Sequence, residues 1–255
     1  MKNEITILVT NDDGIRAEGI TSLAAGLRHL GRIVTVAPEN EQSATSHAIT
    51  LDRPLRIKEY GNDRYGVTGT PTDCVLLAVQ GIIGFKPDLV LSGINHGPNL
   101  GEDVLYSGTV AAAIEGCIMG ISSIAFSIAS WDPHSFSAAS SISAFLAGRM
   151  LENKGNETLL WNVNIPPVQE EEIRGIKVTR LASRIYSDSI IRDVDPRGKE
   201  YYWIGGGEPG WNRDDDSDFS AVTSNFVSLT PMSLDMNDIE GIKRIKSWNL
   251  LWNGK

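Results

Sequence analysis

The sequence predicts an α/β fold in which helices cover both faces of a mostly parallel β-sheet. Short runs of aliphatic residues alternate with segments of helical period over roughly the first two thirds of the chain, which is the pattern of such a sheet. With 255 residues, 41% of them hydrophobic and 22% charged, the chain can bury a full core. We expect a core over residues 1–167 and an extension, with short strands and a terminal helix, over residues 168–255.

The first strand is expected over Ile5–Thr10, where aliphatic residues predominate. A helix follows, because apolar residues recur at helical spacing; its apolar stripe is Ile20, Leu23, Leu27 and Leu30. Gly31 is expected to end that helix. The run "RIVTVAP" then predicts the second strand, Arg32–Pro38.

The run "TPTD" predicts the start of the next helix. Thr70 can cap this helix, Pro71 suits its first position, and Asp73 completes a capping box. The alternation then continues through the strand "PDLVLSGIN", the helix "GTVAAAIEG", the strand "SSIAFSIAS", a helix over Phe136–Leu151 and the strand "LLWNVNIP". Beyond Pro167 we expect short strands and an extended arm, and then a terminal helix that begins near Ile239.

Composition argues against several classes of function. A formal net charge of -9 disfavours a surface that neutralises nucleic-acid phosphates, since such a surface needs clustered Lys and Arg. Cys74 and Cys117 are the only cysteines, which fits a reducing compartment better than a disulfide scaffold. No apolar run is long enough to cross a bilayer, and Asp12 and Asp13 come too early for a signal peptide. We expect a cytoplasmic protein whose partners include neither large nucleic acids nor a membrane.

Polar side chains follow several of the predicted strands at the point where each strand ends. In a parallel sheet these strand ends share one edge, where ligands bind. The residues expected at this edge are Asn11, Asp12, Asp13, Ser43, Thr45, His47, Ser92, Asn95 and Asn99. Carboxylate, hydroxyl and amide oxygens together favour magnesium, manganese or calcium over zinc.

The run "NDDG" has a simpler explanation, because it is rich in residues that form turns. Taken alone, a turn and a ligand site are about equally good interpretations. The position favours the ligand site. Asp12 and Asp13 directly follow an apolar strand, where two like charges repel each other unless a cation lies between them.

A second candidate site is the start of the helix "GTVAAAIEG". Ser107, Gly108 and Thr109 open this helix, whose free N–H groups and positive dipole end can bind an anion. Ordinary capping by Ser or Thr is the alternative. The segment lacks the Lys of a Walker loop, and the first strand lacks a GxGxxG motif, so nucleoside triphosphate hydrolysis and dinucleotide binding lose support.

Five ordered motifs together resemble one known family. The motifs "ILVTNDDGI", "APENEQSATSHAITL", "GTPTDC", "PDLVLSGINHGPNLGEDVLYSGTVAAAIEG" and "VNIP" are similar to the SurE survival-protein family of 5′-nucleotidases, and "VTR", "YYWIGG" and "VSLTP" extend the resemblance. The resemblance implies a Rossmann-like core and a metal-dependent phosphatase that acts on nucleoside monophosphates. It also implies an extension that partly completes the core and partly forms oligomer contacts. Cleavage of 3′-monophosphates and short polyphosphate stays open.

The resemblance also implies roles for particular residues. The metal ligands would be Asp12, Asp13, Ser43 and Asn95, and they would hold one divalent cation per subunit, Mg or Mn. The phosphate would be bordered by Asn99, Ser107, Gly108 and Thr109.

The expected mechanism is hydrolysis by a metal-activated water. Asp12 or Asp13 is the candidate to take the proton of that water. A covalent aspartyl-phosphate route is the alternative among enzymes, although enzymes of that kind separate their two acids by one residue. A non-catalytic nucleotide or phosphate sensor is the alternative outside enzymes.

The run "DDDSDF" from Asp214 lacks the Gly and Glu of a calcium loop, so we expect a solvated acidic loop. His47 and His96 are second-rank candidates for acid or base. The aromatic residues in the expected arm favour contact with a partner, so we expect a homodimer or homotetramer; they are Tyr201, Tyr202, Trp203 and Trp211.

Overall fold

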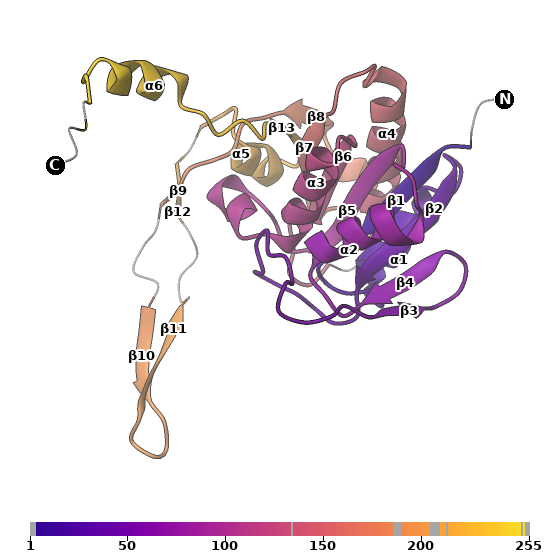
Figure 1. The fold of residues 1–255 in the computed structure, drawn as a ribbon, viewed down its shortest axis with the longest axis horizontal. Helices are drawn as coiled ribbons and strands as arrows, with labels where there is room; N and C mark the ends of the chain where they lie inside the picture. Colours follow the sequence, from indigo (N-terminus) through magenta and orange to yellow (C-terminus); the bar gives the residue numbers. More distant parts are fainter. Residues whose placement is uncertain are drawn as a thin grey trace.

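A computed structural model describes residues 4–133, 135–185, 190–204, 210–212, 214–250 and 252. Its body is a nine-stranded sheet in the order β3-β4-β2-β1-β5-β6-β7-β13-β8, with helices on both faces (Figure 1). Six neighbouring strands, from β4 to β7 in this order, run parallel to one another. The predicted fold class is confirmed.

The parallel strands are β1 (Thr6–Thr10), β2 (Arg32–Pro38), β4 (Arg64–Val67), β5 (Leu89–His96), β6 (Ser123–Ile128) and β7 (Leu160–Ile165). At one edge, β3 (Ile57–Glu59) pairs antiparallel with β4. At the other edge, β13 (Val227–Met232) pairs antiparallel with β7, and β8 (Ile176–Val178) pairs parallel with β13. The chain beyond residue 167 therefore adds two strands to the sheet.

The helices are α1 (Glu18–Gly26), α2 (Pro71–Leu77), α3 (Gly108–Ile118), α4 (Ser137–Asn153), α5 (Asp218–Thr223) and α6 (Ile239–Lys246), with a short 3-10 helix η2 (Gly101–Leu105) before α3. The capping box predicted at the start of α2 is confirmed, since Thr70 and Asp73 each accept the other's backbone N–H. The expected end of the first helix at Gly31 is wrong. Helix α1 ends at Gly26, and a turn in which Leu30 N donates to Leu27 O completes the segment.

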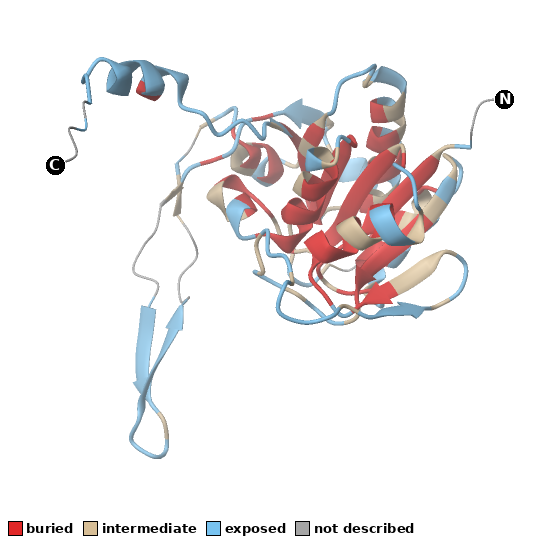
Figure 2. Cartoon of the chain, viewed as in Figure 1, coloured by how far each residue is buried: buried red, intermediate tan, exposed pale blue. Residues whose placement is uncertain are grey.

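The sheet divides the core into two layers (Figure 2). Every residue of β1 is buried, and its side chains alternate between the two faces. Ile7 and Val9 pack with residues of α1 and α4, whereas Leu8 packs with residues of α2. Burial on both faces explains why the sequence shows a continuous apolar run here rather than alternation.

The extension also contains a hairpin that projects away from the body (Figure 1). Its strands β10 (Ile190–Val194) and β11 (Glu200–Ile204) pair antiparallel, and every residue in them is exposed. A shorter pair, β9 (Arg184–Ile185) and β12 (Gly210–Trp211), lies between the hairpin and the body. The described residues contain no helix with the length and apolarity that a bilayer crossing requires.

Candidate functional site

The carboxyl ends of three neighbouring strands bring the predicted residues together. Strand β1 lies between β2 and β5, so the loop that carries Asp12 and Asp13 lies between the loops of both neighbours. On one side, Gln42 N donates to Asp12 O at 2.8 Å, next to Ser43. On the other side, His96 N donates to Asp13 Oδ2 at 3.3 Å, next to Asn95. The structure thus places all four predicted metal ligands in or beside contacting segments.

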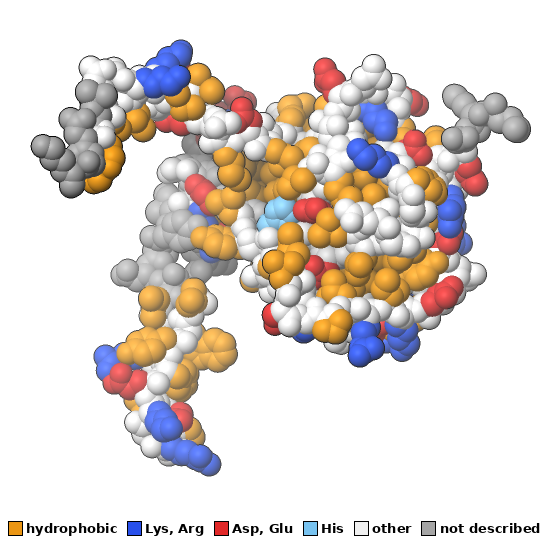
Figure 3. Space-filling model, viewed as in Figure 1, with side chains coloured by type: hydrophobic (Ala, Val, Ile, Leu, Met, Phe, Trp, Pro, Cys, Tyr) orange, Lys and Arg blue, Asp and Glu red, His pale blue; other side chains and the backbone are white. Residues whose placement is uncertain are grey.

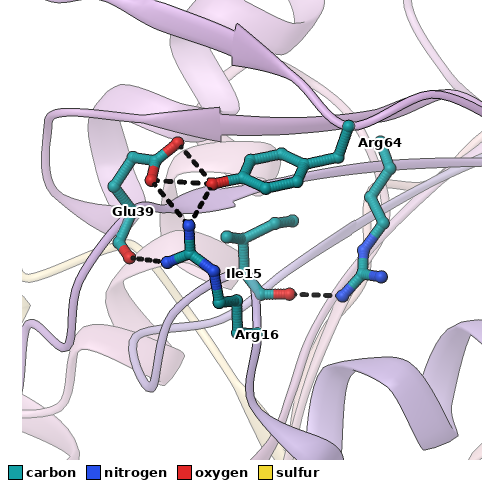
Figure 4. A network of polar contacts seen from close by, with 5 residues as sticks. Ile15, Arg16, Glu39 and Arg64 are labelled. Atoms are coloured by element: carbon teal, nitrogen blue, oxygen red, sulfur yellow. Dashed lines mark hydrogen bonds and ion pairs between the residues drawn. The ribbon is translucent and has the colours of Figure 1, made fainter.

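The loop itself is a tight turn. Buried Asn11 accepts the N–H of Gly14 through Oδ1 at 3.2 Å and donates Nδ2 to its carbonyl at 3.1 Å. The chain beyond the turn is held as well: Arg64 donates to Ile15 O, and Arg16 contacts Glu39 (Figure 4). The run "NDDG" therefore forms the turn that its composition predicts.

The electrostatics of the two acids are unusual. Asp12 is only 5% exposed, and this burial raises its pKa to about 6. The hydrogen bond from the Thr109 hydroxyl lowers the pKa of Asp12, whereas the negative charge of Asp13 raises it. Partial burial also raises the pKa of Asp13, although His96 acts in the opposite direction. Neither acid belongs to an ion pair within the described part of the chain. Two acids withdrawn from water therefore lie together, and no salt bridge from that part of the chain compensates their charge.

The start of α3 abuts Asp12 directly. Thr109 is fully buried, and its hydroxyl donates to Asp12 Oδ1 at 2.5 Å. A Cβ atom added to Gly108 would lie 2.8 Å from the Cβ of Asp12, so only glycine allows this approach. Ser107 caps the helix by accepting Val110 N at 3.1 Å. The expected phosphate end of α3 and the acid pair thus adjoin each other.

Asn99 lies in the loop between β5 and η2, and its side chain points toward the sheet. Its Nδ2 donates to Ser127 Oγ at 2.7 Å, and its backbone N–H donates to Asn164 Oδ1 at 2.8 Å. Its carbonyl accepts both Asn162 Nδ2 at 2.8 Å and Asn164 Nδ2 at 2.9 Å. Our sequence interpretation gave these two asparagines no role, although two amides inside the apolar strand "LLWNVNIP" are a usable signal.

Comparisons with known proteins show the family of this chain. Residues 7–188 match the family described as Survival protein SurE. The chain belongs to the SurE family. A protein named 5′-nucleotidase SurE from Pelobacter propionicus is 48% identical over 95% of this chain and 98% of its own length. The one from Herpetosiphon aurantiacus is 45% identical over 98% of this chain and 99% of its own length. The crystal structure of the SurE protein from Aquifex aeolicus matches with a TM-score of 0.87 at 44% identity, covering 95% of this chain and 99% of that one.

A divalent cation fits the donor atoms of this SurE family member. Among the described residues, no three His, Cys, Asp or Glu side chains gather closely enough to hold a metal. A cation would therefore combine the two carboxylates with neutral oxygens. Asn95 donates its Nδ2 to Gly97 O at 2.9 Å, and its Oδ1 accepts no hydrogen bond from the described residues. Ser43 is exposed and donates to Glu41 Oε1 at 2.6 Å. Two carboxylates together with neutral oxygen donors suit a hard divalent cation.

The two histidines differ in their surroundings. His47 Nε2 lies 2.9 Å from Oε2 of buried Glu115, so it pairs with α3 rather than with the acid loop. The ring of His96 stacks on Phe136, and its Nε2 is buried without a hydrogen-bond partner among the described residues.

A cavity of about 660 Å³ lies beside Ser107 and is mostly apolar; its lining includes His47, Val104, Ile114, Arg180, Met232 and Met236.

Proposed function

We propose that this chain is a metal-dependent phosphatase that hydrolyses nucleoside 5′-monophosphates to nucleoside and inorganic phosphate. The acid pair Asp12 and Asp13, outside every ion pair of the described residues and against the start of α3, carries the proposal. The SurE relatives named 5′-nucleotidase support the substrate class.

The metal ligands in this proposal are Asp12, Asp13, Ser43 and Asn95, which would hold one Mg or Mn ion per subunit. When bound, a divalent cation would neutralise phosphoryl oxygens and lower the pKa of a water nucleophile. Asp12 or Asp13 is proposed to take the proton of that water. Thr109 orients this carboxylate through its hydroxyl.

The phosphoryl group is proposed to bind at the start of α3. The free N–H groups and the positive end of the helix dipole favour an anion there, and Ser107, Gly108 and Thr109 form this end. The loop at Asn99 borders the same end and is fixed by its bonds to β7. The N–H groups at the start of α3 are held in place before the reaction. Fixed donors of this kind stabilise charge in a transition state.

The nucleoside is proposed to enter the cavity beside Ser107. Its volume of about 660 Å³ lies within the usual range for small-molecule sites. The lining offers apolar side chains together with His47 and Arg180 as polar contacts. Such a surface suits a base without demanding one particular pattern of hydrogen bonds.

Release of inorganic phosphate tests the proposal. We would assay nucleoside 5′-monophosphates, 3′-monophosphates and short polyphosphate with Mg, Mn and Ca, before and after chelation. We expect metal-dependent release that is fastest with 5′-monophosphates. Binding without release with every metal would instead indicate a sensor. A phosphoenzyme trapped by acid quench would indicate the aspartyl-phosphate route.

We also propose that the extension assembles the chain into a homodimer or homotetramer. Exposed apolar side chains gather on the hairpin (Figure 3). Trp203 is 66% exposed and Ile204 is 92% exposed, and a single chain rarely leaves such residues uncovered together. Helix α6 likewise exposes Ile239, Ile242 and Ile245. Light scattering should give a mass of two or four chains, and a monomer mass at working concentration would contradict this assembly.

A further inference from the structure

Asp218 is a buried acid outside the proposed metal site. It is the first residue of α5, in the extension, and its side chain is fully buried. The expectation of a solvated acidic loop is therefore wrong for this residue. Its Oδ2 accepts Gly101 N at 2.9 Å, and its Oδ1 accepts Ala182 N at 2.9 Å and Phe219 N at 2.8 Å. One carboxylate thus joins two segments that are far apart in sequence.

Gly101 is the important partner because of its position. It opens η2, the turn that lies between Asn99 and Ser107, the two sides of the proposed phosphate site. Its φ of +53° is in the left-handed region, and a Cβ there would lie 2.4 Å from Ala182 O. The turn that begins at Gly101 therefore contacts the extension directly, at the point where Asp218 accepts the N–H of Gly101.

A second contact follows within the same turn. Glu102 Oε2 accepts Arg184 N at 2.7 Å, and its Oε1 accepts the hydroxyl of Ser183 at 3.0 Å. From the other side, β7 holds the carbonyl of Asn99 through Asn162 and Asn164. The segment from Asn99 to Glu102 is thus clamped between the sheet and the extension.

We propose that Asp218 is a positioning residue for phosphate binding: it fixes the Gly101 turn so that Asn99 and Ser107 keep the spacing that a phosphoryl group requires. This inference rests on the proposed function. It gives the extension a part in the active site of its own chain, in addition to the proposed assembly role. Asp218 does not touch the substrate in this account, and it acts through the backbone of Gly101.

The matched variants are Asp218→Asn and Asp215→Asn. In Asp218→Asn the amide side chain could accept only through its single oxygen and would turn an N–H group toward one of the backbone donors, so at least one bond is lost. Asp215 is exposed in the same acidic run, and its variant makes the same change of charge without a buried bond. Glu102→Ala removes the second contact at a partly exposed position, which keeps the test usable if Asp218→Asn folds poorly.

The readouts are kcat, KM for a nucleoside 5′-monophosphate, inhibition by vanadate, and the metal concentration for half activity. Binding of inorganic phosphate in the presence of Mg, measured by calorimetry, provides a readout that does not need turnover. We expect Asp218→Asn to raise KM and to weaken vanadate and phosphate about tenfold, the cost of one misplaced hydrogen-bonding group. The metal midpoint should stay within about twofold, since Asp218 does not contact the acid loop. Glu102→Ala should change the same quantities in the same direction by less, and Asp215→Asn should change none.

Two results would overturn this role. The first is unchanged phosphate and vanadate binding in a folded Asp218→Asn or Glu102→Ala protein. The second is an equal shift of the metal midpoint, which would indicate a general loosening of the core. If the unmodified protein binds phosphate but releases none from any substrate, the proposed function fails while the calorimetric comparison still decides the role of Asp218.

Discussion

Asp12 and Asp218 are both buried carboxylates, but their surroundings differ. Asp218 accepts three backbone N–H groups within 2.9 Å. Asp12 has the hydroxyl of Thr109 as its side-chain donor, and a second acid, Asp13, follows it in sequence. Burial raises the pKa of both aspartates, and hydrogen bonds oppose that rise in both. The protein thus supplies donors on both oxygens of Asp218 and adds a repelling charge beside Asp12.

Under the proposed function, this difference separates a structural acid from a metal ligand. A charge removed from water is tolerated when hydrogen bonds or a counter-charge replace the lost hydration. The chain meets this requirement at Asp218 with its own backbone. At Asp12 and Asp13, in the proposed function, a bound cation would supply the counter-charge. Four measurements can break or sharpen this contrast.

The largest expected effect is loss of activity when either acid of the pair is neutralised. Asp12→Asn and Asp13→Asn should each lower kcat/KM on the order of a thousandfold, because both remove electrostatic stabilisation in the site. Phosphate release at limiting metal measures the effect, with Asp215→Asn as the control. Near-normal turnover in both variants would mean that the pair is not a ligand site.

A smaller effect should separate the two hydroxyls at the start of α3. Ser107→Ala should slow turnover by roughly a hundredfold if its hydroxyl acts on the phosphoryl group, with the metal midpoint unchanged. Thr109→Val should instead raise the metal midpoint by roughly tenfold, because the hydroxyl of Thr109 orients Asp12. Asn95→Ala should resemble Thr109→Val and recover with excess metal. A metal titration of phosphate release would measure the metal midpoint of each variant. A midpoint shift confined to Ser107→Ala would contradict these roles.

The stability of the metal-free protein should also depend on pH. The pKa of Asp12 is about 6 when folded, above its ordinary value, so between about pH 4 and 6 the folded state binds more protons than the unfolded state. Stability contributed by Asp12 therefore falls as pH rises through this window and is lost above it. A shift of about two units corresponds to about 3 kcal/mol. Urea unfolding should show the difference between Asp12→Asn and the unmodified chain growing from pH 4 to 7. A difference that stays constant with pH would rule out this titration.

The sequence predicted the acid pair because the signal is local. An apolar strand, a turn and two adjacent acids lie within "LVTNDDGI", and the helix start at Ser107 is equally compact. The capping box of Thr70 and Asp73 could be predicted for the same reason. Each of these features depends on residues only a few positions apart.

The residues that sequence reasoning missed depend on contacts between distant segments. Asp218 meets Gly101 across 117 positions, and Asn164 meets Asn99 across 65. The run "DDDSDF" looks solvated because nothing in it shows that one of its acids faces three N–H groups. Local composition gives the charge of such a residue but not the donors that surround it.

The relative stability of two metal-free variants tests the central contrast most directly. Urea unfolding at pH 8 with chelator would compare Asp12→Asn and Asp218→Asn with the unmodified chain. Asp12→Asn should be more stable than the unmodified chain by up to about 3 kcal/mol, because it removes a buried charge next to another acid. Asp218→Asn should be less stable by about 1 to 3 kcal/mol, because the loss of an acceptor for a buried backbone N–H outweighs the relief of removing a buried charge. Shifts of the same sign in both variants would contradict the account.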